Sequence, residues 1–190
     1  MYKIVYLRSD KEGKRLRLGV IVDGETVSLR LTEAEYLDMG SPAVGCELGD
    51  GELSELRALD ERHRALNKAL SLLSYSDKNE RTLLMRLLNC GFSRESAREA
   101  VRTCVSLGYI NEERQLQRLV VAEWRKLYGR RAIVARLCAK SYSRADIERT
   151  VDELEGAGEI DFSESFRRLC EKYGSHEGEQ LLKLKYKYGY

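Results

Sequence analysis

Hydrophobic and polar residues alternate with a period of two over the first thirty residues of the chain. Three stretches have this pattern: Tyr2–Arg8, Arg15–Val22 and Glu25–Leu31. A period of two is typical of half-buried β-strands. Asp23 and Gly24 join the last two stretches, and this pair favours a tight hairpin turn. Thr32 and Glu35 have the spacing of a capping box, so we predict a small β-rich head that ends in a short helix.

A glycine-rich loop around Pro42 follows, and from Leu53 onward the hydrophobic pattern is helical. Residues 64–111 and 114–161 align without a gap at an offset of 50, with ten of 48 positions identical. About three identities are expected by chance at ordinary composition. The identical pairs include Arg81/Arg131, Arg86/Arg136, Ser93/Ser143, Arg94/Arg144 and Gly108/Gly158. Self-similarity at a fixed period predicts a stack of repeated units.

Each unit is predicted to contain three helices. In the first unit, apolar residues recur at helical spacing over three stretches: Leu66 to Leu73, Leu83 to Leu88 and Ala97 to Cys104. Residues suited to capping precede successive helices: Asn79, Ser93 and Asn111, with Ser143 and Asp161 in the second unit. Gly91 is suited to a left-handed position at a helix C-terminus.

A third unit begins on the same spacing, since Phe166 lies 50 residues after Leu116. It reaches the chain end near the place where a second helix would finish, and the sequence leaves open whether this unit is naturally short. The predicted fold is mainly α, with tandem three-helix repeats behind a β-rich head. The predicted domains are a head over 1–55, repeat 1 over 56–111, repeat 2 over 112–161 and a partial repeat 3 over 162–190.

Short motifs in these units resemble those of the RecX family. Residues 69–75 read ALSLLSY, residues 80–88 read ERTLLMRLL, residues 91–93 read GFS and residues 108–113 read GYINEE. The second unit adds YGRR over residues 128–131, and Gly189 with Tyr190 is similar to the turn at Gly91. The likeness extends over about residues 55–190. The chain departs from the family pattern at Ser76, Asn79 and Thr82, which removes charge from that corner of the unit.

The resemblance implies a regulator of the RecA recombinase that acts without catalysis. Such a protein is expected to bind RecA or the RecA–single-stranded DNA filament along its helical groove and to restrain recombination and co-protease activity. A row of small helical units suits this role, because it can contact several protomers through many modest contacts.

The charge of the chain is uneven, although its net charge is only +2. Residues 1–60 carry 8 Lys and Arg against 12 Asp and Glu, whereas the remaining residues carry 25 against 19. A polyanion contact is therefore expected on the helical body. The candidate binding residues are Arg81, Arg86, Arg94, Arg130, Arg131, Arg136, Lys140 and Arg144. The alternative for each is a solvated helix face with local ion pairs.

Two aromatic features are further candidates. Trp124 and Tyr128 could stack on a base or a partner side chain, although a pair spaced by four residues is more often part of a core. The C-terminal stretch interleaves aromatic residues with Lys183, Lys185 and Lys187, as in a single-strand contact. Its alternation suits a strand better than the helix that the resemblance implies, and a disordered tail is equally compatible.

The sequence gives no sign of an enzyme, a cofactor or a metal site. The two histidines are far apart, no Walker motif is present, and no nucleophile stands in a recognisable catalytic motif. The five cysteines form no CxxC pair, and no apolar run reaches about 18 residues. We therefore expect a cytoplasmic, monomeric protein without membrane contact, whose cysteines pack as small buried residues.

Two other functions remain open at this point. The three-helix units could act as helix-turn-helix readers that bind DNA directly, although their third helices lack a polar recognition face. The head could instead be an adaptor, in which case deletion of residues 1–55 should abolish filament binding.

Overall fold

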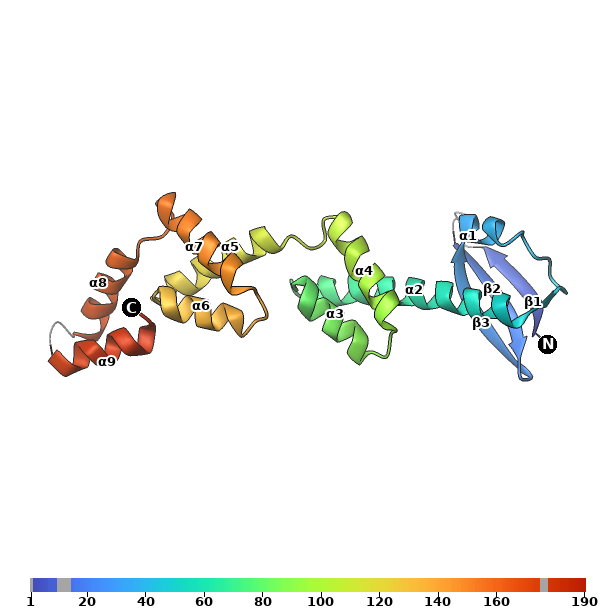
Figure 1. The fold of residues 1–190 in the computed structure, drawn as a ribbon, viewed down its shortest axis with the longest axis horizontal. Coiled ribbons are helices and arrows are strands. Elements are labelled where there is room, and N and C mark those ends of the chain that lie inside the picture. The colour runs from blue at the N-terminus through green and yellow to red at the C-terminus, as the bar shows by residue number, and fades with distance from the viewer. Residues whose placement is uncertain (1, 10–14, 175–177) are drawn as a thin grey trace. The chain divides into compact units, whose positions relative to one another are not determined.

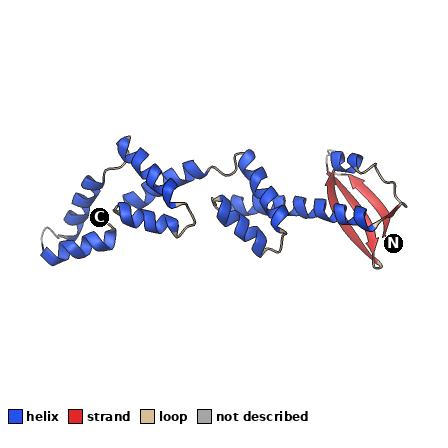
Figure 2. Ribbon diagram, viewed as in Figure 1, coloured by secondary structure: helices blue, strands red, loops and turns tan. Residues whose placement is uncertain are grey.

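The structure is a computed structural model that describes residues 2–9, 15–174 and 178–190 (Figures 1 and 2). These residues form two compact units. Unit 1 consists of Met1–Ser76 with Leu83–Tyr109, and unit 2 consists of Asp77–Thr82 with Ile110–Tyr190. In the described part of the chain, no helix is long and apolar enough to span a membrane.

The head of unit 1 is an antiparallel sheet in the order β3-β2-β1-β4. Its strands are β1 (Tyr2–Ser9), β2 (Arg15–Val22), β3 (Glu25–Thr32) and the short β4 (Glu47–Leu48). The three strands predicted from the alternating pattern are confirmed. Asp23 and Gly24 have φ angles of 52° and 84°, the left-handed values that a tight hairpin turn needs. Thr32 and Glu35 form the predicted capping box of helix α1 (Glu33–Asp38).

One face of the sheet is buried by helix α2 (Asp50–Tyr75), as Figure 1 shows. Alternate strand residues such as Leu18, Val20 and Leu29 pack with Leu53 and Leu56 of this helix. The helix begins three residues before the predicted start at Leu53. It then continues without a break as the first helix of repeat 1, so the head and the first repeat share one helix.

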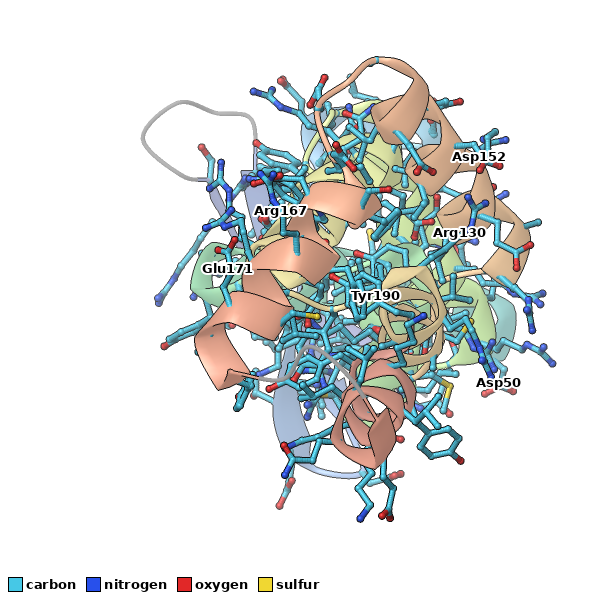
Figure 3. All side chains as sticks on the ribbon, turned by 90° about the vertical axis from the view of Figure 1, so that its left-hand side faces the viewer. Asp50, Arg130, Asp152, Arg167, Glu171 and Tyr190 are labelled. Carbon is cyan, nitrogen blue, oxygen red and sulfur yellow. The ribbon has the colours of Figure 1, made fainter. Side chains whose placement is uncertain are left out.

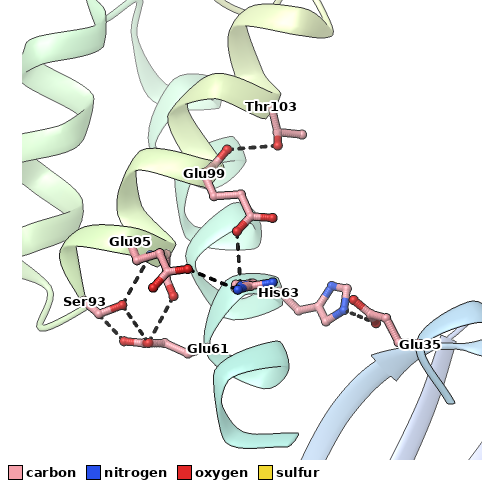
Figure 4. Close-up of polar contacts among 9 residues, drawn as sticks. Glu35, Glu61, His63, Ser93, Glu95, Glu99 and Thr103 are labelled. Atoms are coloured by element: carbon pink, nitrogen blue, oxygen red, sulfur yellow. Dashed lines mark hydrogen bonds and ion pairs between the residues drawn. The ribbon is translucent and has the colours of Figure 1, made fainter. Parts of the chain in front are cut away.

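Polar contacts hold α2 to the elements on either side of it (Figure 4). His63 lies 2.7 Å from the carboxylate of Glu35 on α1. Glu61 accepts hydrogen bonds from the backbone and the hydroxyl of Ser93, and Arg62 pairs with Glu95 and Glu99 of helix α4 (Arg94–Ser106). These contacts fix the orientation of the first helix of repeat 1 against its third helix.

The predicted caps are all present at helix N-termini. Repeat 1 has helix α3 (Glu80–Asn89), where Asn79 accepts from the backbone of Thr82, and α4, where Ser93 accepts from Ser96. Repeat 2 consists of three helices: α5 (Glu112–Arg125), α6 (Arg130–Cys138) and α7 (Arg144–Gly156). Asn111 caps α5 and Ser143 caps α7. The second and third helices of repeat 2 start 50 residues after those of repeat 1, as the sequence repeat predicts, whereas α2 starts earlier than the repeat because it also covers the head.

The C-terminal segment folds as two helices, α8 (Phe162–Tyr173) and α9 (Gly178–Tyr188), with Asp161 as the cap of α8. The preference for a strand or a disordered tail was wrong. In α9 the lysines and Tyr186 are exposed, whereas Tyr188 and Tyr190 pack inside unit 2, so the alternation along the sequence does not correspond to two faces of a strand.

The expectation that all five cysteines are buried was also wrong. Cys104 and Cys170 are buried, but Cys46, Cys90 and Cys138 are exposed. Cys90 directly follows α3, and Cys138 is the last residue of α6.

Candidate partner-binding surface

The predicted cationic residues lie on second helices and at the start of third helices. Arg81 and Arg86 are on α3 and Arg94 begins α4. Their counterparts Arg131 and Arg136 are on α6, and Arg144 begins α7. Arg130 is the first residue of α6, and Lys140 follows that helix. The repeat therefore places these cations at equivalent positions of two similar units.

In repeat 1, the three predicted arginines are exposed. Arg81, Arg86 and Arg94 form no ion pair with any residue that the structure describes, and the same holds for Arg131 in repeat 2. An unpaired guanidinium keeps all its donors for a partner, so contact with an anion does not first break an internal salt bridge. These four residues are called the open arginines below.

Arg136 has a different environment, because it is bonded to a buried carboxylate. Its Nε donates to Glu123 at 2.7 Å, and the Glu123 side chain is only 3% exposed. Lys126 lies 2.8 Å from the same carboxylate and Lys140 lies 4.0 Å from it. Burial alone would raise the pKa of Glu123, but the bonds from Lys126 and Arg136 outweigh it and lower that pKa. Arg136 and Lys140 therefore help to neutralise the buried carboxylate of Glu123.

Arg130 and Arg144 form ion pairs on the surface. Arg130 contacts Asp152 and lies 3.5 Å from Glu155, and Figure 3 shows Arg130 and Asp152 side by side. Arg144 pairs with Glu148 at 2.8 Å along the same helix. Exposed pairs of this kind contribute little to stability, about 0–1 kcal/mol, and can exchange for a partner's anion.

Trp124 and Tyr128 are used inside unit 2. Both are partly buried against the core of repeat 2, and the indole nitrogen of Trp124 donates to the carbonyl of Asp161 at 3.1 Å. The ring of Tyr128 lies 4.2 Å below the guanidinium of Arg136. Tyr128 falls beyond the end of α5, so the two rings do not form a pair along one helix. Packing accounts for both rings.

The lysines of the C-terminal segment lie on α9 and are exposed. Lys183 pairs with Glu179 at 2.7 Å. Lys185 lies 5.2 Å from the ring of Phe166, and Lys187 lies 5.6 Å from the ring of Tyr188. The ammonium groups of Lys185 and Lys187 therefore lie near aromatic rings of unit 2, and both side chains remain exposed to solvent.

The aromatic residues at the chain end pack α9 against α8, and they also contact repeat 2, where the ring of Tyr188 lies 5.6 Å from that of Tyr128. The hydroxyl of Tyr190 lies 2.5 Å from that of Ser165, and its ring lies 4.8 Å from Phe166 (Figure 3). Burial raises the pKa of Tyr190. The Tyr188 hydroxyl lies 2.6 Å from that of Tyr173, and this hydrogen bond raises the pKa of Tyr188 to about 12. Both tyrosines remain neutral hydrogen-bonding groups at physiological pH.

Two features of this region are not evident from the sequence. Glu123 is a buried carboxylate, although glutamate in a helix is ordinarily exposed. A cavity of about 560 Å³ in unit 2 is lined by residues from distant parts of the chain, among them Asn79, Gln115, Arg118, Lys140 and Tyr142. The amide of Asn79 also donates to the carbonyl of Lys140 at 3.0 Å, which joins residues 77–82 to the end of α6.

Over the residues that the structure describes, no group of three or more His, Cys, Asp or Glu side chains is placed to hold a metal ion. The arrangement offers guanidinium and ammonium groups for ionic contacts with an anionic partner, set on rigid helices.

Comparison with known proteins finds similarity among solved structures. No family model matches the sequence, and no curated protein matches it either. A solved structure, the crystal structure of regulatory protein RecX, superposes with a TM-score of 0.69 at 16% sequence identity. The match covers 97% of this chain and 90% of that chain, so it includes the head as well as the repeats. The resemblance first seen in short motifs therefore extends to the three-dimensional structure: the chain has the RecX fold.

Proposed function

We propose that this protein is a regulator of RecA that binds RecA or the RecA–single-stranded DNA filament along its groove and inhibits recombinase and co-protease activity. The observation that carries the proposal is the match to the RecX fold over 97% of the chain, combined with the RecX-like motifs in the repeats. The proposed action is by binding, without catalysis, in the cytoplasm.

The distribution of charge supports this proposal. Repeat 1 and repeat 2 present cations at equivalent positions, so a partner with regularly repeated acidic groups could be contacted by both. Single exposed ionic contacts contribute only about 0.2–1 kcal/mol each, and a useful affinity needs several of them together. The open arginines are the strongest candidates, because they form no ion pair with the residues that the structure describes.

The first experiment is co-sedimentation with RecA filaments assembled on single-stranded DNA, followed by the DNA-dependent ATPase assay of RecA. The test variant replaces the open arginines Arg81, Arg86, Arg94 and Arg131 with Glu. We expect its inhibition of the ATPase to weaken by about tenfold or more, since four contacts are each reversed.

The matched control replaces four other exposed arginines with Glu: Arg98, Arg102, Arg125 and Arg168. This control has the same change in net charge, so a general electrostatic effect would weaken both variants equally. Inhibition by the test variant at the level of the control would show that the open arginines do not bind the filament. Arg136 is left unchanged in both, because its loss would leave Glu123 buried beside fewer cations.

Direct DNA binding is separated from filament binding by a third measurement. Affinities for bare single strands, bare duplexes and RecA-coated strands are compared at one physiological salt concentration, since ionic affinities depend strongly on salt. The proposal requires the RecA-coated strand to bind most tightly. Equal or tighter binding to bare DNA would reject it in favour of a DNA-binding protein.

A further inference from the structure

Three arginines stand in direct cross-strand register in the head. Arg8 of β1 is paired with Arg17 of β2, and Arg17 is paired with Arg30 of β3. Residues that are directly opposite in an antiparallel sheet project from the same face. Neighbouring strands lie about 4.8 Å apart, so the three side chains form a row of about 10 Å across the sheet.

The row lies on the face opposite the one that α2 covers. Along β2, Leu16 and Leu18 are buried, whereas Arg15 and Arg17 between them are exposed. We call this second side of the sheet the outer face. Its exposed cations come from three strands: Lys3, Arg8, Arg15, Arg17 and Arg30. The paired strand residues place one carboxylate on the same face, that of Glu47 opposite Lys3.

Such a row is unfavourable in the isolated protein. Like charges directly opposite each other destabilise a sheet, and here two such pairs share Arg17. None of the three arginines forms an ion pair with a residue in the described ranges 2–9, 15–174 and 178–190. A bound polyanion would remove this repulsion.

An aromatic ring lies beside the row. Tyr6 is paired with Gly19 across the strands, and its ring covers that glycine so closely that a Cβ on Gly19 would lie 2.2 Å from the ring. The guanidinium of Arg8 lies 4.9 Å from the centre of the same ring. Gly19 therefore allows the Tyr6 ring to lie flat on the outer face, next to the cations.

We propose that the outer face of the head binds single-stranded nucleic acid. Arg8, Arg17 and Arg30 contact successive phosphates, and Tyr6 stacks on a base. A cationic row with an adjacent aromatic ring is the combination that binds single strands, because phosphates need the charge and unpaired bases offer faces for stacking. An acidic protein surface would use the arginines, whereas a single strand would also use the ring as a stacking platform. The proposal goes beyond filament regulation and holds without it.

The test measures fluorescence anisotropy of a labelled thymidine oligonucleotide with the full chain, without RecA, over a range of salt concentrations. The variant Arg8→Ser/Arg17→Ser/Arg30→Ser should bind at least tenfold more weakly. Its slope of log affinity against log salt should be shallower by about 2, since each phosphate contact on a single strand contributes about 0.7. The control Arg57→Ser/Arg98→Ser/Arg102→Ser removes the same charge from exposed helix positions.

Equal affinities and slopes for the two triple variants would overturn the proposal, as would a wild-type protein that does not bind the oligonucleotide at low salt. Misfolding is a separate outcome that can be recognised: removal of the like-charge row should leave the thermal midpoint unchanged or raise it.

The stacking part has its own test. Tyr6→Phe keeps the ring and should bind within about twofold of the wild type, whereas Tyr6→Leu should lose about fivefold or more. Photo-crosslinking to an oligonucleotide with 5-iodouracil should modify Tyr6. Adducts confined to exposed tyrosines elsewhere, such as Tyr75 or Tyr186, would overturn the assignment of the site to the head. Equal affinity for a single strand and for a duplex of the same length would overturn the stacking contact of Tyr6.

Discussion

Repeat 1 and repeat 2 have the same three-helix arrangement, but an arginine at the same position of both repeats has a different environment in each. Arg86 of repeat 1 is exposed and has no ion-pair partner in the described structure, whereas its counterpart Arg136 is bonded to Glu123. The position equivalent to Glu123 in repeat 1 is Leu73. A single difference between the repeats thus turns one copy of a duplicated arginine into a structural residue. Recurrence at equivalent positions is therefore weak grounds for assigning equal roles.

The second helices of the two repeats also begin differently. At the start of α3, the side chain of Asn79 accepts from the N–H of Thr82, and the carboxylate of Glu112 accepts from the N–H of Glu80. The amide of Asn79 in turn donates to the carbonyl of Lys140. Position 129 is a glycine, and the N–H groups of Gly129 and Arg131 donate instead to the carbonyls of Tyr188 and Gly189 at the end of α9. Backbone carbonyls of the α9 end therefore cap the second helix of repeat 2, whereas side-chain oxygens cap that of repeat 1.

The largest effect is expected where this capping contact is tightest. Gly189 has a φ of 77°, and a Cβ there would lie 2.3 Å from the backbone nitrogen of Ala132. Gly189→Ala should therefore destabilise unit 2 by about 3 kcal/mol, from left-handed strain and overpacking together. Gly91 has the same left-handed conformation after α3, with a φ of 86°, but nothing lies within 4 Å of an added Cβ, so Gly91→Ala should cost only about 1 kcal/mol. Urea unfolding followed by tyrosine and tryptophan fluorescence measures both, and equal losses would show that the α9 contact is not specific.

The next effect concerns the arginine itself. Arg136→Met removes one hydrogen bond to the buried carboxylate of Glu123 and should lower the free energy of unfolding by about 2 kcal/mol. Lys126 and Lys140 remain near the carboxylate and limit the loss. Arg86→Met at the equivalent position should stay within about 0.5 kcal/mol. If the two substitutions have the same small effect, Arg136 is as available for binding as Arg86.

Replacement of both partners sharpens the same comparison. Glu123→Leu/Arg136→Met gives repeat 2 an apolar residue at the position where repeat 1 has Leu73. It should recover at least about 1 kcal/mol relative to Arg136→Met alone, because no buried charge is left without its partner. A double-mutant cycle that includes Glu123→Leu measures this coupling. Additive effects would mean that the ion pair contributes nothing to the fold.

Much of the fold could be predicted because its determinants are local. The strands follow from alternation, the hairpin from Asp23 and Gly24, and the helix starts from caps such as Ser93 and Ser143. The offset of 50 residues then gave the three-helix unit. The C-terminal helix could not be predicted from its own pattern, because its lysines and tyrosines alternate as in a strand, and the contacts that hold it, such as Tyr188 against Tyr128, are tertiary.

The candidate binding surface could be predicted only in part. Sequence placed the arginines on the right helices, but it could not distinguish Arg86 from Arg136, since burial of Glu123 depends on tertiary packing. The arginine row of the head was hidden by the acidic composition of residues 1–60. It becomes evident only when strand register places Arg8, Arg17 and Arg30 opposite one another.

The smallest effect is a dependence of stability on pH. The pKa of Glu123 is lowered below its ordinary value of 4.5 in the folded protein, so the unfolded chain binds its proton more readily. This group therefore stabilises the fold fully above about pH 4.5, and the contribution is lost as the pH falls through the lowered pKa. The pKa values of Glu35 and Glu61 in unit 1 are lowered as well, so the wild type should lose stability in acid for several reasons.

The variant Glu123→Leu/Arg136→Met keeps Glu35 and Glu61, and its unfolding free energy should fall less steeply than that of the wild type between about pH 5 and 3. Parallel curves from urea unfolding would mean that the carboxyl of Glu123 has the same pKa in the folded and unfolded chain. In that case the distinction between the two repeats would rest on geometry alone.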